Sequence, residues 1–305
     1  YQQPTGRYQY VLDLQKPEVF AYLFERLDDL LSRYDISYVK WDMNREVVQP
    51  GHDGKAALYG QTLRLYALLD ELRLRHPKVE FESCASGGGR IDFEILKSTH
   101  RFWTSDNNDA LERQQIQRGM SYFFPPEVMG AHIGGRHCHC TRRSHSIGFR
   151  GLTALFGHMG VELDPVKEST EEQAGFTHYI ALHKQLRPLL HSGNVVRIDH
   201  HDPALQINGV IAQDQSCAVF LLSQLAMPTY SLSGTARLAG LDPTKQYRLN
   251  VLDQPASLRT GGVMKKLPLW LDEEITLSGD WLAKAGLALP VMDPESAVLI
   301  KLEAE

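Results

Sequence analysis

The sequence has few cysteines and lacks a long apolar run. Its four cysteines, at positions 84, 138, 140 and 217 of 305, are too sparse and irregular for a disulfide scaffold. This usage favours a reducing compartment, and we expect a cytoplasmic location. No stretch of eighteen apolar residues occurs, so we expect no transmembrane helix and no membrane partner.

An excess of positive charge is also missing. The chain has 32 Lys and Arg against 37 Asp and Glu, a net charge of -5, which excludes the basic surface typical of nucleic-acid-binding domains. Hydrophobic residues make up 43% of the chain, which predicts a folded globular protein. A targeting pattern is absent from the first residues, and "YQQPTGRYQYVLDL" is typical of the middle of a domain, so we expect a longer parent protein.

Residues 1–193 alternate between strand-like and helix-like segments, which predicts βαβ units with a parallel sheet. The expected strands are "YQYVLDL", "ISYVKWD", "VEFESCAS", "RFWTSD" and "VMGAHI", with a sixth near "GHMGVEL". Helices are expected from Pro17 to about Tyr34, from Leu58 to before Pro77, over "ALERQQIQRGMSYFF" and at about 169–191. A complete eight-stranded α/β barrel needs about 250 residues. The fold class predicted for 1–193 is therefore a (β/α)8 TIM-type barrel that lacks its first strands.

Residues 194–305 have a different pattern. The segments "NVVRI", "LQINGVIA", "CAVFLLSQL", "QYRLNVLD" and "AVLIKLE" alternate or are continuously apolar, with Gly, Pro and Asp between them. This pattern predicts an antiparallel β-sandwich. We expect this second domain to have a core of its own and to fold alone.

Two aspartates lie where parallel barrel strands are expected to end. Asp42 closes "VKWD" and Asp106 closes "FWTSD", and the ends of such strands form the active site of an α/β barrel. Lys40 shares a strand face with Asp42, because side chains alternate between faces. A pair of carboxylates at such ends suits glycosidic cleavage. The alternatives are an ion pair at a strand end, or aspartates that cap the following helices, although Asp109 is the better cap for "ALERQQ".

Five motifs together resemble the α-galactosidases of glycoside hydrolase family 36. They are "GR" at 6–7, "VKWDMNR" at 39–45, "ESCASGGGRID" at 82–92, "FWTSDNNDALERQQIQ" at 102–117 and "MGAHIG" at 129–134. The motifs themselves, their order and their spacing are all similar to those of the family. The resemblance extends to the C-terminal sandwich. "KWD" and "CxSGGGR" are specific in combination, whereas each alone is weak.

The resemblance implies roles for six residues. Asp42 corresponds to the nucleophile and Asp106 to the acid/base of a retaining double displacement. Lys40 and Arg7 correspond to positions that bind the galactose hydroxyls. Cys84 and Gly87 correspond to the loop beside the C2 side of the sugar. The implied substrate is a melibiose- or raffinose-type α-galactoside, with no metal or organic cofactor, and the full-length form is expected to be a homo-oligomer.

Two other features have competing interpretations. "HCHC" at 137–140 could indicate a metal site, but its spacing fits no familiar zinc pattern, and we expect a loop. Glu82 could be a third carboxylate in the barrel, but a buried, hydrogen-bonded structural role is the stronger expectation.

The main departure from the resembled family is at the front. The family's N-terminal β-domain, first barrel strands, paired aspartates for the C4 and C6 hydroxyls and tryptophan wall have no counterparts in these 305 residues. Two alternatives therefore stay open beside α-galactosidase. One is an α-N-acetylgalactosaminidase or a galactosyl-transferring relative. Cys84 in the loop beside C2 argues against an acetamido substrate, because it favours a plain hydroxyl over the larger group. The other is a truncated fragment without turnover.

Overall fold

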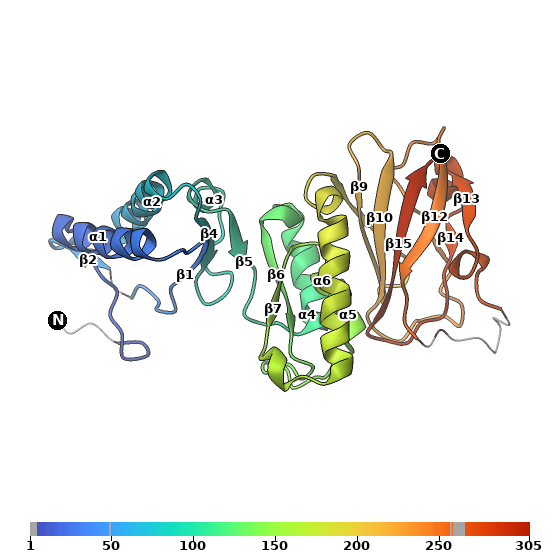
Figure 1. The fold of residues 1–305 in the computed structure, drawn as a ribbon, viewed down its shortest axis with the longest axis horizontal. Coiled ribbons are helices and arrows are strands. Elements are labelled where there is room, and N and C mark those ends of the chain that lie inside the picture. Colours follow the sequence, from blue (N-terminus) through green and yellow to red (C-terminus); the bar gives the residue numbers. More distant parts are fainter. Residues whose placement is uncertain (1–4, 49, 257, 259–265) are drawn as a thin grey trace. The chain divides into compact units, whose positions relative to one another are not determined.

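The computed structural model describes residues 5–48, 50–256, 258 and 266–305, and the chain divides into two compact units, 1–106 and 107–305 (Figure 1). The predicted domain boundary between 193 and 194 lies inside the second unit, after a long helix and before the first antiparallel strand. We keep that boundary as a proposal. Within the described residues, the helices are too short or too polar to cross a membrane.

The first unit is built on three parallel strands. β1 (Tyr38–Asp42) pairs with β4 (Glu80–Cys84), which pairs with β5 (Arg101–Trp103). The chain passes through α1 (Pro17–Arg33) before β1, and through α2 (Leu58–Arg75) and the short α3 (Ile95–Ser98) between the strands. A small hairpin of β2 (Gly51–His52) and β3 (Lys55–Ala56) precedes α2. Strand and helix therefore alternate as predicted.

The core of the first unit lies between its helices and its strands. Phe20 and Leu31 of α1 pack in one buried cluster with Leu68, Leu69 and Leu72 of α2 and with Phe81 of β4. Pro17 stands at the first helical position of α1, where its missing N–H costs nothing, and α2 ends before Pro77. These two helix boundaries confirm the sequence prediction.

The strand predicted over "YQYVLDL" is wrong. Among the described residues, the only bridge near this segment is an isolated one between Gly6 and Gln9. Its later backbone groups bond a side chain, because Gln61 of α2 accepts from the Leu14 N–H (2.8 Å) and donates to the Leu12 carbonyl (3.0 Å). Polar partners on a helix therefore take the place of the ladder that a strand would need.

The second unit begins with the remaining parallel strands. β6 (Met129–Gly134) pairs with β7 (His158–Glu162), which confirms the sixth predicted strand. The helices are α4 (Ala110–Met120), α5 (Ile147–Ala154) and α6 (Thr170–Leu190), with short 3₁₀ turns at Pro126–Val128 and Pro165–Lys167. Asp109, Ser146 and Ser169 cap α4, α5 and α6 with side-chain oxygens, as short polar residues do at helix starts.

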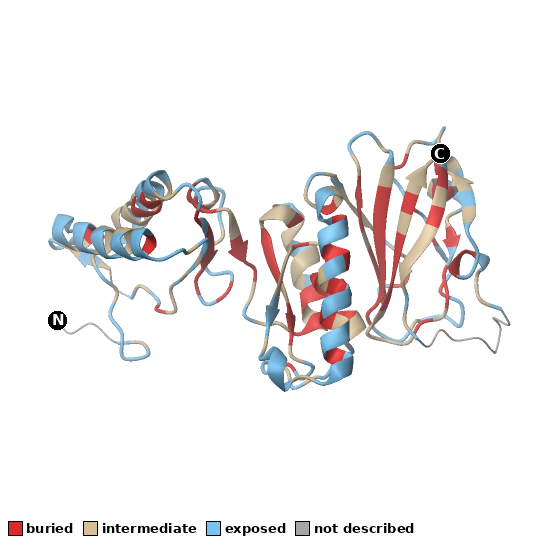
Figure 2. Ribbon diagram, in the orientation of Figure 1, coloured by how far each residue is buried: buried red, intermediate tan, exposed pale blue. Residues whose placement is uncertain are grey.

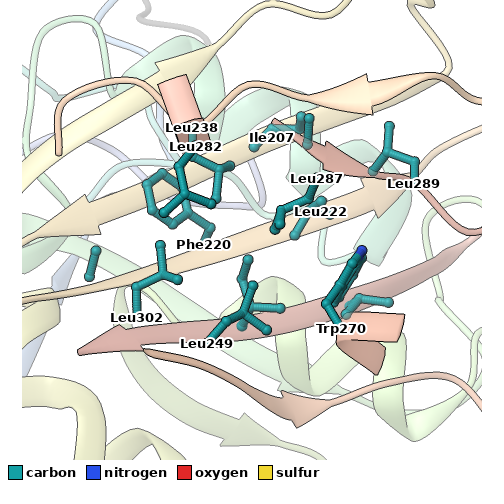
Figure 3. Close-up of a cluster of buried hydrophobic side chains, with 14 of the residues drawn as sticks. Ile207, Phe220, Leu222, Leu238, Leu249, Trp270, Leu282, Leu287, Leu289 and Leu302 are labelled. Carbon is teal, nitrogen blue, oxygen red and sulfur yellow. The ribbon is translucent and has the colours of Figure 1, made fainter. Parts of the chain in front are cut away.

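A six-stranded antiparallel sheet follows, in the order β13-β12-β15-β10-β9-β8. Its strands are β8 (Asn194–Ile198), β9 (Leu205–Ile211), β10 (Cys217–Gln224), β12 (Gln246–Asp253), β13 (Ile275–Ser278) and β15 (Ser296–Ala304). One face is covered by the strand pair β11 (Thr235–Ala236) and β14 (Leu287–Ala288), the 3₁₀ turn Leu269–Leu271 and α7 (Gly279–Lys284). Ile207, Phe220 and Leu222 of the sheet meet Leu238, Leu282 and Leu287 in this core (Figure 3).

The other face of the same sheet is buried under the barrel helices. Val210, Val219 and Leu221 share one buried cluster with Phe149 of α5 and Leu182 of α6. The bands of buried residues on α6 and the neighbouring strands are seen in Figure 2. The expectation that the C-terminal region has a core of its own is therefore correct for one face and wrong for the other.

Candidate active site

Asp42 is the last residue of β1 and lies opposite Cys84 in the parallel register with β4. Burial alone would raise the pKa of Asp42, but the Cys84 thiol, the Asn44 amide (2.6 Å to Oδ2) and the charge of Lys40 together hold it below its ordinary value. Asp42 is therefore an ionised carboxylate, held at a strand end by hydrogen bonds from Cys84, Asn44 and the Met43 N–H. That is the state a nucleophile requires.

The two groups that bond Asp42 are themselves fixed. The Asn44 side-chain oxygen accepts from the Ser86 N–H (3.1 Å) and hydroxyl (3.2 Å), so its NH₂ group faces Asp42. Burial raises the pKa of Cys84 to about 11, which keeps the thiol protonated as a donor to Asp42. Sequence reasoning missed Asn44 and Ser86, although both lie inside the motifs "VKWDMNR" and "ESCASGGGRID".

Lys40 is paired with Glu82. The Lys40 ammonium lies 3.8 Å from Glu82 Oε1 and 4.4 Å from the centre of the Trp103 ring, within the range of a cation–π contact. The ion pair that the sequence left open was between Lys40 and Asp42, whereas the structure pairs Lys40 with Glu82, across β1 and β4. Lys40 acts on Asp42 through its field, which lowers the pKa of that aspartate.

Asp106 lies just beyond β5, and the Trp103 indole N–H donates to its Oδ1 (3.0 Å). Asp106 does not cap α4, because Asp109 accepts the N–H groups of Leu111 and Glu112. The prediction that Asp109 is the cap is confirmed. Asp42 does not cap the helix that follows it either, because Ala57 occupies the N-cap position of α2. The capping alternative is therefore wrong for both aspartates.

Gly87 brings the loop after β4 against Asp106. Its φ is +80°, and a Cβ added there would lie 2.7 Å from the Asp106 backbone nitrogen. Only glycine combines this left-handed conformation with so close an approach. Since Cys84 at the start of the loop bonds Asp42, the two candidate carboxylates flank one loop. The sequence suggested a close approach to sugar here, and the structure shows one to backbone.

A pocket of about 680 Å³ adjoins Asp42, and a volume of this size is typical of small-molecule sites. Arg7, Asp42, Asn44 and Arg90 contribute to its lining. Arg90 also joins two strands, since it donates to the carbonyls of Trp41 (3.0 Å) and Cys84 (2.8 Å). All six candidate residues (Arg7, Lys40, Asp42, Cys84, Gly87 and Asp106) belong to the first unit. Their individual roles stay predictions.

The "HCHC" loop separates its cysteines, since Cys138 is buried and Cys140 exposed. In the described part of the chain, no cluster of three or more His, Cys, Asp or Glu side chains is arranged to hold a metal. Nearby, His145 lies between Asp109 (3.1 Å) and Glu295 (2.9 Å).

Comparison with known proteins assigns the family. The Melibiase family model matches residues 1–193, and the model of the glycosyl hydrolase family 36 C-terminal domain matches 204–302. The chain belongs to glycoside hydrolase family 36, the melibiase family.

Several relatives of this chain are named α-galactosidases. One from Escherichia coli is 60% identical over 99% of this chain and 43% of its own length. The solved α-galactosidase of Lactobacillus brevis has a TM-score of 0.86 at 31% identity, and one of Geobacillus stearothermophilus in complex with raffinose has 0.87 at 30%. Each structural match covers 100% of this chain and 40% of the other. The predicted fold class is confirmed, and the chain spans about two fifths of these relatives.

Proposed function

We propose that this chain supplies the catalytic carboxylates of a retaining α-galactosidase. The observation that carries the proposal is the placement of Asp42 and Asp106 at the ends of β1 and β5, on either side of the loop that begins at Cys84. One carboxylate is held ionised by the Cys84 thiol, the Asn44 amide, the charge of Lys40 and the Met43 N–H. The other is oriented by an indole hydrogen bond. Such a division between two carboxylates is what double displacement at an anomeric carbon needs.

In the proposed reaction, Asp42 attacks the anomeric carbon while Asp106 donates its proton to the leaving oxygen. Asp106 then removes a proton from water, which releases the sugar from Asp42 with retained configuration. Asn44 and Cys84 keep the attacking carboxylate in position through their hydrogen bonds. Lys40 and Arg7 bind the sugar hydroxyls.

The proposed substrates are terminal α-galactosyl groups of melibiose- or raffinose-type oligosaccharides. The α-galactosidase AgaA of Geobacillus stearothermophilus has been solved in two variants, one in complex with raffinose and one with stachyose, which supports this class. The second candidate is an α-N-acetylgalactosaminide. Cys84 speaks against it, because a thiol beside the C2 position leaves less room for an acetamido group than for a hydroxyl.

The test compares two proteins. One is residues 1–305 alone. The other, called the extended form, joins residues 1–305 to the N-terminal part of the Escherichia coli relative. We expect the extended form to hydrolyse an aryl α-galactoside, but neither its β-anomer nor the aryl α-N-acetylgalactosaminide. Preference for the acetamido substrate would favour the second candidate, and no turnover of any of the three would contradict both.

Two further parts of the proposal concern the whole protein. We propose a cytoplasmic location, which rests on the sparse cysteines, all four of which are free thiols in the structure. We also propose that the full-length protein forms a homo-oligomer, by analogy with the family alone. Sedimentation of the extended form measures the latter.

A further inference from the structure

Glu82 is the most buried charged side chain on the sheet of the first unit, and the proposed reaction gives it no task. It is 2% exposed, at the centre of β4. Its neighbours in the register are Lys40 on β1 and Arg101 on β5. A buried carboxylate is strongly unfavourable unless counter-charges compensate it.

The carboxylate contacts both of these neighbours, and the Tyr38 hydroxyl on β1 also hydrogen-bonds it. Oε1 faces the Lys40 ammonium at 3.8 Å, and Oε2 accepts from Arg101 Nε at 3.2 Å. A row of positive, negative and positive groups therefore crosses three parallel strands. Arg101 has a second partner, Glu80, at 2.7 Å.

Lys40 also lies close to Trp103. The ammonium is 4.4 Å from the centre of the Trp103 ring, and the same indole donates its N–H to Asp106. Glu82, Lys40, Trp103 and Asp106 thus form one continuous chain of contacts. Lys40 also lowers the pKa of Asp42. This one amine therefore acts on Asp42 directly and contacts the tryptophan that hydrogen-bonds Asp106.

We propose that Glu82 is a positioning residue, which holds the Lys40 ammonium over Trp103 and so fixes the amine relative to Asp42 and Asp106. The expected effect of Glu82 on kcat/KM rests on the proposed function. The expected effect on the place of Lys40 does not. Without Glu82, Lys40 and Arg101 face each other across β4 as like charges, which disfavours the observed place of Lys40. A lysine at the end of a flexible stem needs such an anchor to bind a hydroxyl in one geometry.

The structural test uses residues 1–305 and the indole N–H signals of their four tryptophans in a ¹H–¹⁵N spectrum. Loss of a signal in Trp103→Phe assigns Trp103. We expect Glu82→Gln to move the Trp103 signal in the same direction as Lys40→Met. Glu80→Gln is the matched control, because it removes a carboxylate from Arg101 but not from Lys40. An unmoved Trp103 signal in Glu82→Gln, or an equal shift in Glu80→Gln, would overturn the proposal.

Glu82→Asp keeps the charge and serves if Glu82→Gln does not fold. The shorter side chain draws the carboxylate away from Lys40, and it too should move the Trp103 signal. A folded Glu82→Asp with the wild-type signal contradicts the proposal.

The kinetic test uses a double-mutant cycle in the extended form. We expect Glu82→Gln to lower kcat/KM for an aryl α-galactoside on the order of tenfold in the wild-type background. In the Lys40→Met background we expect less than about a twofold effect, since the residue through which Glu82 acts is gone. Equal losses in both backgrounds would assign Glu82 to folding alone. If the extended form is inactive, the proposed function fails, and the tryptophan spectrum still decides the role of Glu82.

Discussion

At the scale of single residues, the sequence predicts what depends on strand geometry alone. Lys40 and Asp42 share a face because side chains alternate, and the structure places both there. The partner of Lys40 could not be predicted, because the register of β1 against β4 is set by packing distant in sequence. The same holds for Ser86, which orients Asn44 from forty-two residues away.

Replacement of Asp106 by alanine tests the acid/base assignment. In the extended form, we expect Asp106→Ala to reduce hydrolysis of raffinose by a hundredfold or more, on the order of the 10²–10⁴ that general acid catalysis contributes. An aryl α-galactoside with a very acidic leaving group should lose far less, because its departure needs no proton. With this aryl substrate, azide should restore the rate of Asp106→Ala and yield an α-galactosyl azide. A similar loss on both substrates without azide rescue would assign Asp106 to structure.

At the scale of elements, local chemistry marks helix ends better than short strands. Pro17 and Asp109 open α1 and α4 through effects that act within one turn, and both were predicted. β11, β13 and β14 span two to four residues, too few for a period-two pattern, and were missed. The strand over "YQYVLDL" was predicted from the β propensity of its residues. In the described part of the chain no neighbouring strand pairs with this segment, so the propensity alone does not form a strand.

The start of α4 gives a pH-dependent prediction. Asp109 is fully buried, and although burial would raise its pKa, bonds from Thr141, the Glu112 N–H and His145 hold the pKa below its ordinary value. A carboxyl group with a lowered folded-state pKa contributes stability above its unfolded value of about 3.9, and this is lost as pH falls through the folded value. Acid should therefore weaken this helix start.

The variant Asp109→Asn retains a capping oxygen but loses the charge. We expect it to be about 2 kcal/mol less stable at pH 7, with the difference from wild type shrinking below pH 4. Urea unfolding at several pH values measures this. Asp29→Asn, which breaks an exposed pair with Arg33, is the control and should change little. A constant difference from pH 7 to pH 3 would show that the Asp109 charge does not stabilise the fold.

At the scale of the whole molecule, the sequence predicted the order of parallel and antiparallel regions but not how they share a core. The sequence pattern changes between residues 193 and 194. In the structure, by contrast, residues 107–305 form one compact unit. The reason is the six-stranded sheet, whose second face packs on α5 and α6 through Val219 and Leu221. A strand that is apolar on both faces, such as "CAVFLLSQL", already indicates burial on both sides.

Truncation tests this shared core. We expect residues 107–305 to give a cooperative thermal transition, and residues 194–305 to aggregate or to melt without cooperativity, because removal of α5 and α6 exposes an apolar sheet face. Circular dichroism and size-exclusion chromatography distinguish the outcomes. A soluble, cooperatively melting 194–305 would show that the face toward the helices is dispensable.

Both candidate carboxylates lie in one unit, but we expect residues 1–305 alone to be a poor catalyst. The chain spans 43% of its Escherichia coli relative, and the family's groups for the C4 and C6 hydroxyls have no counterparts in these residues. Each lost charge-assisted hydrogen bond is worth about 1.5–3 kcal/mol, so at the middle of that range two or three of them amount to about three decades in rate or more. We expect residues 1–305 alone to hydrolyse an aryl α-galactoside at least a thousandfold less efficiently than the extended form. Comparable kcat/KM values would show that the sugar is held within 1–305.

In the proposed reaction, Asp42 forms a covalent bond to galactose. The most direct measurement is to treat the extended form with a 5-fluoro-α-galactosyl fluoride, which slows release of the intermediate, and to locate the label by peptide mass spectrometry. We expect one fluorogalactosyl group on the peptide that contains Asp42, and no label or turnover in Asp42→Asn. A label on another residue, or turnover of an α-galactoside that releases β-galactose first, would contradict the proposed reaction.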